Sequence, residues 1–264
     1  MPIKLFWWGG DTGGINFGDS ISPLIVRHLS GKEVVHRTVP HCDVVAVGSL
    51  IDTVVRKQWR RDIAFRLSRI KVWGSGSFKP HRVRKHRRLD VFAVRGPLTR
   101  DAMNLDPDLP LGDPGLLIDR LQPLVAKRYR WGIIPHVVDA DASIISEVSN
   151  GTENSIVINL RNPDLLETIR QIMSCDFIVS SSLHGVIAAD ALGIPHLWTK
   201  VGDKVFGVDW KFRDYFLSME REAPAPISLG GDLRKLEDQA VRSERSVVEK
   251  RQNALESSFK LMNL

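Results

Sequence analysis

The apolar residues of this chain fall into short continuous runs bounded by polar turns, and this pattern restricts the fold more than any other feature. Such runs occupy residues 3–8, 44–47, 91–94, 156–158 and 177–179. A strand with one solvated face alternates apolar and polar residues, whereas a strand buried on both faces is apolar throughout. Because parallel sheets are covered on both faces, we predict buried parallel strands at these positions.

Helix-start signals follow several of these runs. Residues 162–164 (Asn-Pro-Asp) offer an N-cap, a proline at the first helical position and an acid in the first turn. The segment 165–173 then places its apolar residues on one helical face, and a new strand follows it directly. The turn at 180–185 (SSSLHG) leads into a second helical stretch, which Gly-Ile-Pro at 193–195 stops. This β-α-β-α-β order indicates an α/β fold with right-handed crossovers.

The first half of the chain shows the same alternation. We expect strands near residues 3–8, 43–48, 70–74 and 90–95, and a helix from about 19 to 29. Each strand again ends at a turn that contains glycine or a charged residue. The two halves therefore predict two α/β units.

Length and composition agree with two domains of ordinary size. The chain has 264 residues, of which 43% are hydrophobic, so it can bury a sizeable core and is not globally disordered. A proline-rich stretch at 106–114 and the turn-like sequence after it put the boundary near residue 120. We predict an N-terminal domain over 1–120, a C-terminal domain over 121–230, and a final segment over 231–264. That segment forms one long helix, from about 233 to 262, that packs across both domains.

The cysteines and histidines give no sign of a disulfide framework or a metal site. Cys42 and Cys175 are far apart and belong to no CxxC arrangement. His36, His41 and His136 are scattered, without partners at ligand spacing. We therefore predict no bound metal.

Positive charge is concentrated in one segment. The chain has 37 Lys and Arg against 31 Asp and Glu, a net charge of +6. Residues 56–88 alone hold 13 basic residues and one acid, which leaves the rest of the chain mildly acidic, at −6. This distribution argues against the charge coat of a histone-like or ribosomal protein. The N-terminal residues do not fit a signal peptide, and no run of about 18 apolar residues exists, so we expect a cytoplasmic location.

The core of the basic segment has three open interpretations. Residues 79–88 (KPHRVRKHRR) contain six Lys or Arg and no acid. They form a solvated loop, contact anionic lipid or a lipid-linked diphosphate at the inner membrane, or bind nucleic acid. Little aromatic interleaving and no recognised motif argue against nucleic acid. Peripheral contact with an anionic membrane is the functional interpretation that we prefer.

Ligands of open α/β sheets bind beyond the carboxyl ends of the strands, so candidate site residues are sought at strand-to-helix turns. The turn at 16–19 (NFGD) follows a glycine-rich loop and begins a helix. Asn16, Gly18 and Asp19 can hold an anion or a sugar hydroxyl there. The alternative is that Asp19 simply caps the helix.

The turn at 180–185 combines three serine hydroxyls, the amides of a helix N-terminus and His184. This combination suits an anion, with His184 as a proton donor or, when charged, as a cation. Residues at the end of the preceding strand would open on the same rim. The substrate-binding candidates of this region are Asn159, Arg161, Ser181 and Ser182.

Three other turns carry polar residues. Arg95 ends a buried strand, and its planar guanidinium suits an anion in a cleft, with a structural ion pair as the alternative. Ser75 lies in a glycine-rich turn, 73–77 (WGSGS), that matches no nucleotide-binding motif and is equally well explained as a tight turn. Asp113 precedes Pro114, which is an ordinary pair at a helix start.

Taken together, these turns resemble the polysaccharide pyruvyl transferase family. The matching stretches keep the family's order over most of the chain: 16–19, 73–77, 93–99 (AVRGPLT), 111–117 (LGDPGLL) and 176–195 (DFIVSSSLHGVIAADALGIP). The resemblance implies a GT-B-like fold of two Rossmann-type domains with parallel sheets that face a central cleft. It implies transfer of a pyruvyl group from phosphoenolpyruvate to two hydroxyls of a saccharide, with no further cofactor. The compact length resembles the branch that modifies exopolysaccharides through a pyruvate ketal.

The resemblance also implies roles for individual residues. The family's motif Arg and His fall on Arg95 and His184, which we expect to act as anion clamp and general acid on the donor side. Asp19 is the expected acceptor contact or base. Many members carry an Arg two residues before the His, where this chain has Ser182. Arg161 or a residue of the basic segment is the candidate replacement.

Two other functions stay open for these residues. The same fold serves nucleotide-sugar glycosyltransferases, and fold alone does not fix the reaction. The basic segment leaves a nucleic-acid-binding protein as the second alternative. A nucleotide sugar that stabilised the protein when phosphoenolpyruvate did not would favour the glycosyltransferase.

Overall fold

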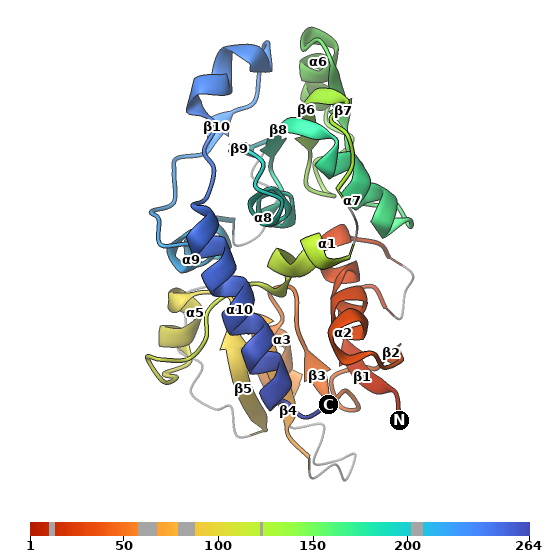
Figure 1. The fold of residues 1–264 in the computed structure, drawn as a ribbon, viewed down its shortest axis with the longest axis vertical. Helices are drawn as coiled ribbons and strands as arrows, with labels where there is room; N and C mark the ends of the chain where they lie inside the picture. The colour runs from red at the N-terminus through yellow and green to blue at the C-terminus, as the bar shows by residue number, and fades with distance from the viewer. Residues whose placement is uncertain (11–13, 58–67, 79–87, 122–123, 202–207) are drawn as a thin grey trace.

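A computed structural model describes residues 1–10, 14–57, 68–78, 88–121, 124–201 and 208–264. It contains two five-stranded sheets, one from each half of the chain, and every recorded strand pair within them is parallel (Figure 1). Each sheet carries helices, so each half has a Rossmann-like arrangement. This confirms the α/β prediction and the inference from continuous apolar runs to parallel strands.

The first sheet has the strand order β2-β1-β3-β4-β5. Its strands are β1 (Ile3–Phe6), β2 (Val34–His36), β3 (Val44–Val45), β4 (Ile70–Ser75) and β5 (Leu89–Val94). The helices of this half are α1 (Phe17–Ser20), α2 (Ser22–Ser30), α3 (Ile51–Lys57), α5 (Pro97–Ala102) and the 3₁₀ helix η1 (Pro114–Arg120).

The helix predicted from 19 to 29 is two helices, α1 and α2, which meet at Ile21. The break has a local cause. Pro23 has no N–H to donate to the carbonyl four residues earlier, on Asp19, so the hydrogen-bond ladder is interrupted there. The short α1 turns Asn16 and Asp19 toward the interior of the molecule, where the candidate site lies.

The second sheet has the order β10-β9-β8-β6-β7. Its strands are β6 (Tyr129–Ile134), β7 (Ser155–Val157), β8 (Cys175–Ser180), β9 (His196–Lys200) and β10 (Ile227–Ser228). The remaining helices are α6 (Ser143–Gly151), α7 (Leu165–Met173), α8 (Leu183–Ala191), α9 (Val208–Ser218), the 3₁₀ helix η2 (Leu233–Gln239) and α10 (Arg245–Leu261).

The start of α7 differs in detail from the prediction. Asp164, not Asn162, is its N-cap, because the Asp164 carboxylate accepts a hydrogen bond from the backbone N–H of Glu167 at 2.9 Å. Asn162 instead accepts from the N–H of Asp164 at 3.0 Å and shapes the turn before the helix. Pro163 therefore lies outside α7 and not at its first position.

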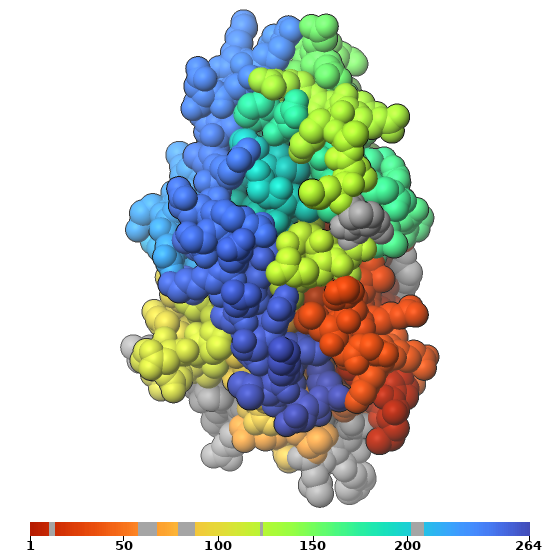
Figure 2. All heavy atoms as spheres, in the orientation of Figure 1, coloured from red at the N-terminus to blue at the C-terminus, as the bar shows by residue number. Residues whose placement is uncertain are grey.

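The expected single helix over 233–262 is wrong. Its first part is η2, which packs with the second half, and residues 240–244 are extended, with Val241 bridged to His196 of β9. Only then does α10 begin. Figure 1 shows α10 running back over β4 and β5, and Figure 2 shows its dark-blue atoms on the surface, from the middle of the molecule down over the first half.

The contacts of α10 with the first half are specific. The indole N–H of Trp73 on β4 donates to the backbone carbonyl of Leu255 at 3.0 Å, and Gln252 donates to the carbonyl of Leu116 at 2.7 Å. Leu255 belongs to one buried cluster that continues from the first sheet into the second. The two halves therefore share a core.

Among the described helices, none combines the length and the apolar character that crossing a membrane would require.

We predict that Leu255→Ala lowers the free energy of unfolding by about 2–5 kcal/mol, because it leaves a cavity where α10 meets the shared core. Chemical denaturation measures this loss. Asn253→Ala, at an exposed position of the same helix, is the control and should change stability by less than about 0.5 kcal/mol. Equal effects of the two changes would contradict the packing described for α10.

Candidate functional site

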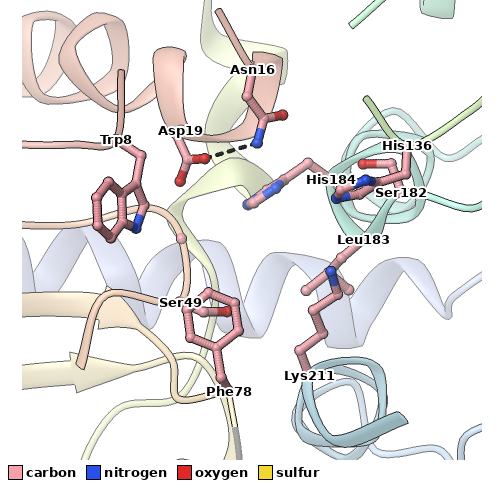
Figure 3. Close-up of a pocket in the computed structure, with 11 residues that line it drawn as sticks. Trp8, Asn16, Asp19, Ser49, Phe78, His136, Ser182, Leu183, His184 and Lys211 are labelled. Carbon is pink, nitrogen blue, oxygen red and sulfur yellow. Dashed lines mark hydrogen bonds between the residues drawn. The ribbon is translucent and has the colours of Figure 1, made fainter. Parts of the chain in front are cut away.

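A pocket of ≈ 230 Å³ lies where strand ends of both sheets meet (Figure 3). Its lining residues follow β1, β3 and β4 of the first sheet and β6 and β8 of the second, and α9 closes one side. The lining consists of Trp8, Asn16, Asp19, Gly48, Ser49, Phe78, His136, Ser182, Leu183, His184 and Lys211. A polar pocket beyond the carboxyl ends of parallel strands is where this class of fold binds ligands.

The first half contributes a carboxylate to the pocket. Asp19 is 8% exposed, and its Oδ2 accepts a hydrogen bond from the Asn16 side chain at 2.8 Å. Burial raises the pKa of Asp19 to about 7, although Asn16 and Lys211 oppose the shift. Gly48 makes room for this carboxylate, because a Cβ there would lie 2.5 Å from Asp19 Oδ1. Asp19 is therefore a group that exchanges its proton near neutral pH.

The second half contributes an imidazole. Ser182 is the N-cap residue of α8, and His184 follows in its first turn. The ring packs directly against the backbone of Gly18, since a Cβ at Gly18 would lie 1.9 Å from His184 Nδ1. The NFGD turn thus uses its glycine to admit the histidine of the SSSLHG turn, which brings the two most distant motifs together.

Three basic side chains form one wall of the pocket: Lys211 on α9, His136 after β6, and His184. Burial is the main cause that lowers the pKa of Lys211 to about 8, of His136 to about 4 and of His184 to about 3, and the positive charge of Lys211 contributes to both histidine shifts. At neutral pH the lysine is therefore charged and the imidazoles are neutral. A bound anion would raise all three pKa values, so the wall can take up protons together with an anion.

Arg95 does not line the pocket, and the structure has the ion pair that was the alternative to an anion contact. Its side chain is fully buried, and Nε lies 3.2 Å from Asp214 Oδ2 in an ion pair. Nη1 donates to Ser49 Oγ at 2.8 Å and Nη2 to the Ser77 carbonyl at 2.9 Å. The absent side chain of Gly76 leaves space for the guanidinium, because a Cβ there would lie 2.2 Å from Arg95 Cζ. Arg95 holds a lining residue, Ser49, and its charge helps to lower the pKa of His184.

Two predicted serines support the pocket from behind. Ser75 is buried, donates to the Gly48 carbonyl at 2.8 Å and accepts from the Leu50 N–H at 3.1 Å. Ser181 is also buried and accepts from the backbone N–H of His136 at 2.9 Å. Neither lines the pocket, whereas Ser182 does. These two hydroxyls fix the loops that carry Gly48 and His136.

Asn159 and Arg161 lie outside the pocket. Arg161 lines a shallower neighbouring hollow with Gly14, Ile15, Val137 and Val138. Its Nη1 donates to Asp141 Oδ2 at 3.1 Å, Nη2 donates to the Val137 carbonyl, and its backbone N–H donates to Asn159 Oδ1 at 2.9 Å. The expected shared rim with the SSSLHG turn is therefore not found. That Arg161 replaces the family Arg at the position of Ser182 stays a prediction.

Several lining residues were not among the predicted site residues: Lys211, His136, Trp8, Ser49 and Phe78. Four of these follow the ends of strands, so a search of every strand end would have found them. Lys211 lies within a helix between two aromatic residues, and no sequence signal marks it. The predicted contacts of the basic segment fall mostly on residues 58–67 and 79–87, which lie outside the described residues. Within the described ranges, no group of three or more His, Cys, Asp and Glu is arranged for a metal ion.

We predict that Asp19→Asn stabilises the protein at pH 8 by about 2–4 kcal/mol, because the native pKa is raised from 3.8 to about 7. The folded state then binds more protons than the unfolded state between about pH 4 and 7, so stability is lost as the pH rises through this window. Denaturation curves at pH 4 and pH 8 measure the difference, which should nearly vanish at pH 4. Asp238→Asn, at an exposed acid of η2, controls for the loss of a charge alone. If the stability difference between Asp19→Asn and the wild-type protein did not grow with pH, the raised pKa of a buried Asp19 would be refuted.

Comparison with known proteins links this geometry to a family. The model of a family described as polysaccharide pyruvyl transferase matches residues 4–201. The succinoglycan biosynthesis protein ExoV of Rhizobium meliloti is 25% identical over 219 residues, which are 81% of this chain and 64% of that protein. An uncharacterized protein of Acanthamoeba polyphaga mimivirus is 39% identical over 113 residues, 40% of this chain and 38% of its own length.

The chain thus spans less than two thirds of the length of either curated relative. A solved structure of a functionally uncharacterized protein from Klebsiella pneumoniae has a TM-score of 0.49 and 11% identity, over 87% of this chain and 93% of that one. The family match covers both sheets except β10, together with all lining residues of the pocket apart from Lys211. The chain belongs to the polysaccharide pyruvyl transferase family.

Proposed function

We propose that this protein transfers a pyruvyl group from phosphoenolpyruvate to two hydroxyls of a saccharide and forms a pyruvate ketal. The observation that carries the proposal is the division of the pocket: one wall is basic, and the opposite wall combines a carboxylate with two aromatic rings. Family membership supports an enzyme of polysaccharide pyruvylation. The paired Rossmann-like halves are also what a GT-B-like enzyme would have.

The basic wall suits the donor. Phosphoenolpyruvate carries a phosphate and a carboxylate on three carbon atoms, and both anions need nearby cations. Lys211 supplies a full charge at neutral pH, while His136 and His184 become charged as the anion raises their pKa values. Ser182 adds a hydroxyl at the N-terminus of α8, where partial positive charge favours an anion. Phosphoenolpyruvate is the donor, and the proposal requires no other cofactor.

The reaction balances with one acid and one base. A proton adds to the methylene carbon of phosphoenolpyruvate, which becomes a methyl group, and the adjacent carbon becomes electrophilic. One saccharide hydroxyl attacks that carbon, the carbon–oxygen bond to phosphate breaks, and a second hydroxyl closes the ring. Two hydroxyl protons are released; they balance the proton gained by the methylene and the one taken by phosphate. His184 acts as the acid, and Asp19 accepts a hydroxyl proton.

The opposite wall suits the acceptor. Trp8 is 40% exposed and, with Phe78, faces the pocket from the first half (Figure 3). The C–H-bearing face of a pyranose ring packs well on an aromatic ring, and a nearby carboxylate hydrogen-bonds its hydroxyls. Asp19 lies beside these rings, so a stacked sugar would present hydroxyls to the base. The name of the relative ExoV, a succinoglycan biosynthesis protein, supports a polysaccharide acceptor.

Phosphate release from phosphoenolpyruvate in the presence of saccharide acceptors tests this function. We expect His184→Gln to reduce the rate about 10²–10⁴-fold, which is the usual contribution of a positioned acid. His41→Gln, at an exposed histidine, should leave the rate unchanged. Near-normal phosphate release by His184→Gln would show that His184 is not the general acid. Thermal stabilisation by UDP- or GDP-sugars, without any by phosphoenolpyruvate, would favour the glycosyltransferase alternative.

We predict that Trp8→Ala raises the KM for the acceptor about 10-fold or more, since stacking on one aromatic ring contributes about 1–3 kcal/mol. The KM for phosphoenolpyruvate should not change, because the donor lies on the other wall. Steady-state kinetics with each substrate varied in turn separates the two constants. Trp8→Phe keeps an aromatic face and should recover part of the affinity. An equal loss for both substrates would contradict the division of the pocket.

A further inference from the structure

A buried carboxylate lies behind His184, on the side away from the pocket. Asp113 is fully buried, and its Oδ2 lies 3.8 Å from His184 Nε2. Neither atom has a hydrogen-bond partner among the described residues. The imidazole therefore has its Nδ1 edge against Gly18 and the pocket, and its Nε2 edge toward Asp113.

The cap that Asp113 makes does not account for this second oxygen. Oδ1 of Asp113 accepts from the Gly115 N–H at 2.9 Å and so caps η1. That contact uses one oxygen only. A buried carboxylate oxygen without a partner costs free energy, so its placement opposite an imidazole nitrogen that also lacks one is informative. A shift of about 1 Å would bring the pair to hydrogen-bond distance.

The fold brings η1 close to the first turn of α8. Gly115 allows this approach, because a Cβ there would lie 3.0 Å from the Ile187 side chain. On the other side of η1, Gly74 has φ +75, and a Cβ there would lie 2.3 Å from Pro114 Cδ. Glycines on both sides thus let the Asp113 turn fit against α8. The LGDPG motif therefore places the Asp113 carboxylate directly behind His184 of the SSSLHG motif.

The cations around the pair disfavour a charged imidazole and favour an ionised Asp113 carboxylate. Arg95 and Lys211 act on His184 from the other elements around it, and both disfavour its positive charge. Burial raises the pKa of Asp113 to about 6, although the hydrogen bond from the Gly115 N–H and the charge of Arg95 oppose the shift. Asp113 is the carboxylate within ion-pair distance of the ring in the described part of the chain. It is therefore the group that can stabilise His184 in its charged form.

We infer that Asp113 is the positioning residue of His184: its carboxylate holds the Nε2 proton, leaves Nδ1 to the substrate, and stabilises the imidazolium that forms when an anion binds. The inference rests on the proposed function only in the identity of the substrate that contacts Nδ1. The side chain does not touch the substrate and acts through the imidazole. Catalytic histidines commonly have such a carboxylate behind them, and the contact often tightens only in the complex.

The tautomer of His184 gives a test that does not depend on activity. We expect ¹⁵N NMR of the free wild-type protein to find His184 neutral with its proton on Nε2, and the spectrum of His184→Gln assigns the signal. In Asp113→Asn the amide oxygen can keep the Gly115 cap, while the amide N–H₂ donates to Nε2. The proton of His184 should then move to Nδ1. A wild-type proton on Nδ1 overturns the inference without reference to any variant.

Kinetics supply the second measurement. Asp113→Asn should lower kcat for phosphate release about 10²–10⁴-fold. Asp232→Asn is the matched control, because Asp232 caps η2 by the same contact, at 3.0 Å to the Arg234 N–H. It should change neither the tautomer nor kcat.

The outcomes separate this inference from the proposed function. An unchanged His184 tautomer in a folded Asp113→Asn protein, or an unchanged kcat, overturns the inference. If the wild-type protein has the expected tautomer but releases no phosphate from phosphoenolpyruvate with any acceptor, the proposed function is overturned. The pairing of Asp113 with His184 is then still supported.

Discussion

The buried ion pair between Arg95 and Asp214 is the interaction on which the arrangement of the pocket depends. Asp214 lies on α9, between β9 and β10 of the second sheet in the chain, whereas Arg95 follows β5 of the first. The Asp214 carboxylate also accepts from the Thr99 N–H at 3.0 Å and the Thr99 hydroxyl at 2.6 Å. Three donors therefore hold one buried carboxylate, as a buried charge requires. The contact fixes α9 against the first half, and Lys211, three residues before Asp214, is carried to the pocket.

Glycines decide how closely the site side chains approach one another. Gly18 admits His184, Gly48 admits Asp19 and Gly76 admits Arg95, each at a distance that a Cβ would block. The glycines of the motifs are thus explained by contacts with groups elsewhere in the chain rather than by loop flexibility. Only Gly48 of the three has a φ, +106, that itself favours glycine.

Most strands, several helices and much of the pocket's location could be predicted from the sequence, because apolar runs and turn residues are local signals. The parallel strands, the crossover helices and the strand-end positions of Asp19 and His184 were predicted from it. The ion pair of Arg95 was left open only as an alternative, because its partner Asp214 is 119 residues away and no local sequence signal identifies it. Lys211 was missed for the same reason. The break between η2 and α10 also depends on a distant contact, the bridge between Val241 and His196.

Asp113 illustrates a different limit. From the sequence, an Asp before Pro is sufficiently explained as a helix start, and the structure bears out that cap. The cap uses one carboxylate oxygen, and the other lies opposite His184 because η1 and α8 are neighbours in the fold. A local role that uses half of a side chain is therefore compatible with a second role that only the tertiary structure reveals.

Because α9 and α10 pack on the first half, neither half of the chain could be replaced independently by that of a relative. Residues 1–121 contain the carboxylate and aromatic wall but none of the basic wall, and the second sheet contains neither Asp19 nor the partner of Asp214. In a chimaera with a relative, joined at the connection between η1 and β6, α9 from one parent would pack on α5 of the other, and α10 would pack on its β4 and β5. Recombination within the family would therefore have to preserve the surfaces that α9 and α10 contact as well as the pocket, so these surfaces should change together when such proteins diverge.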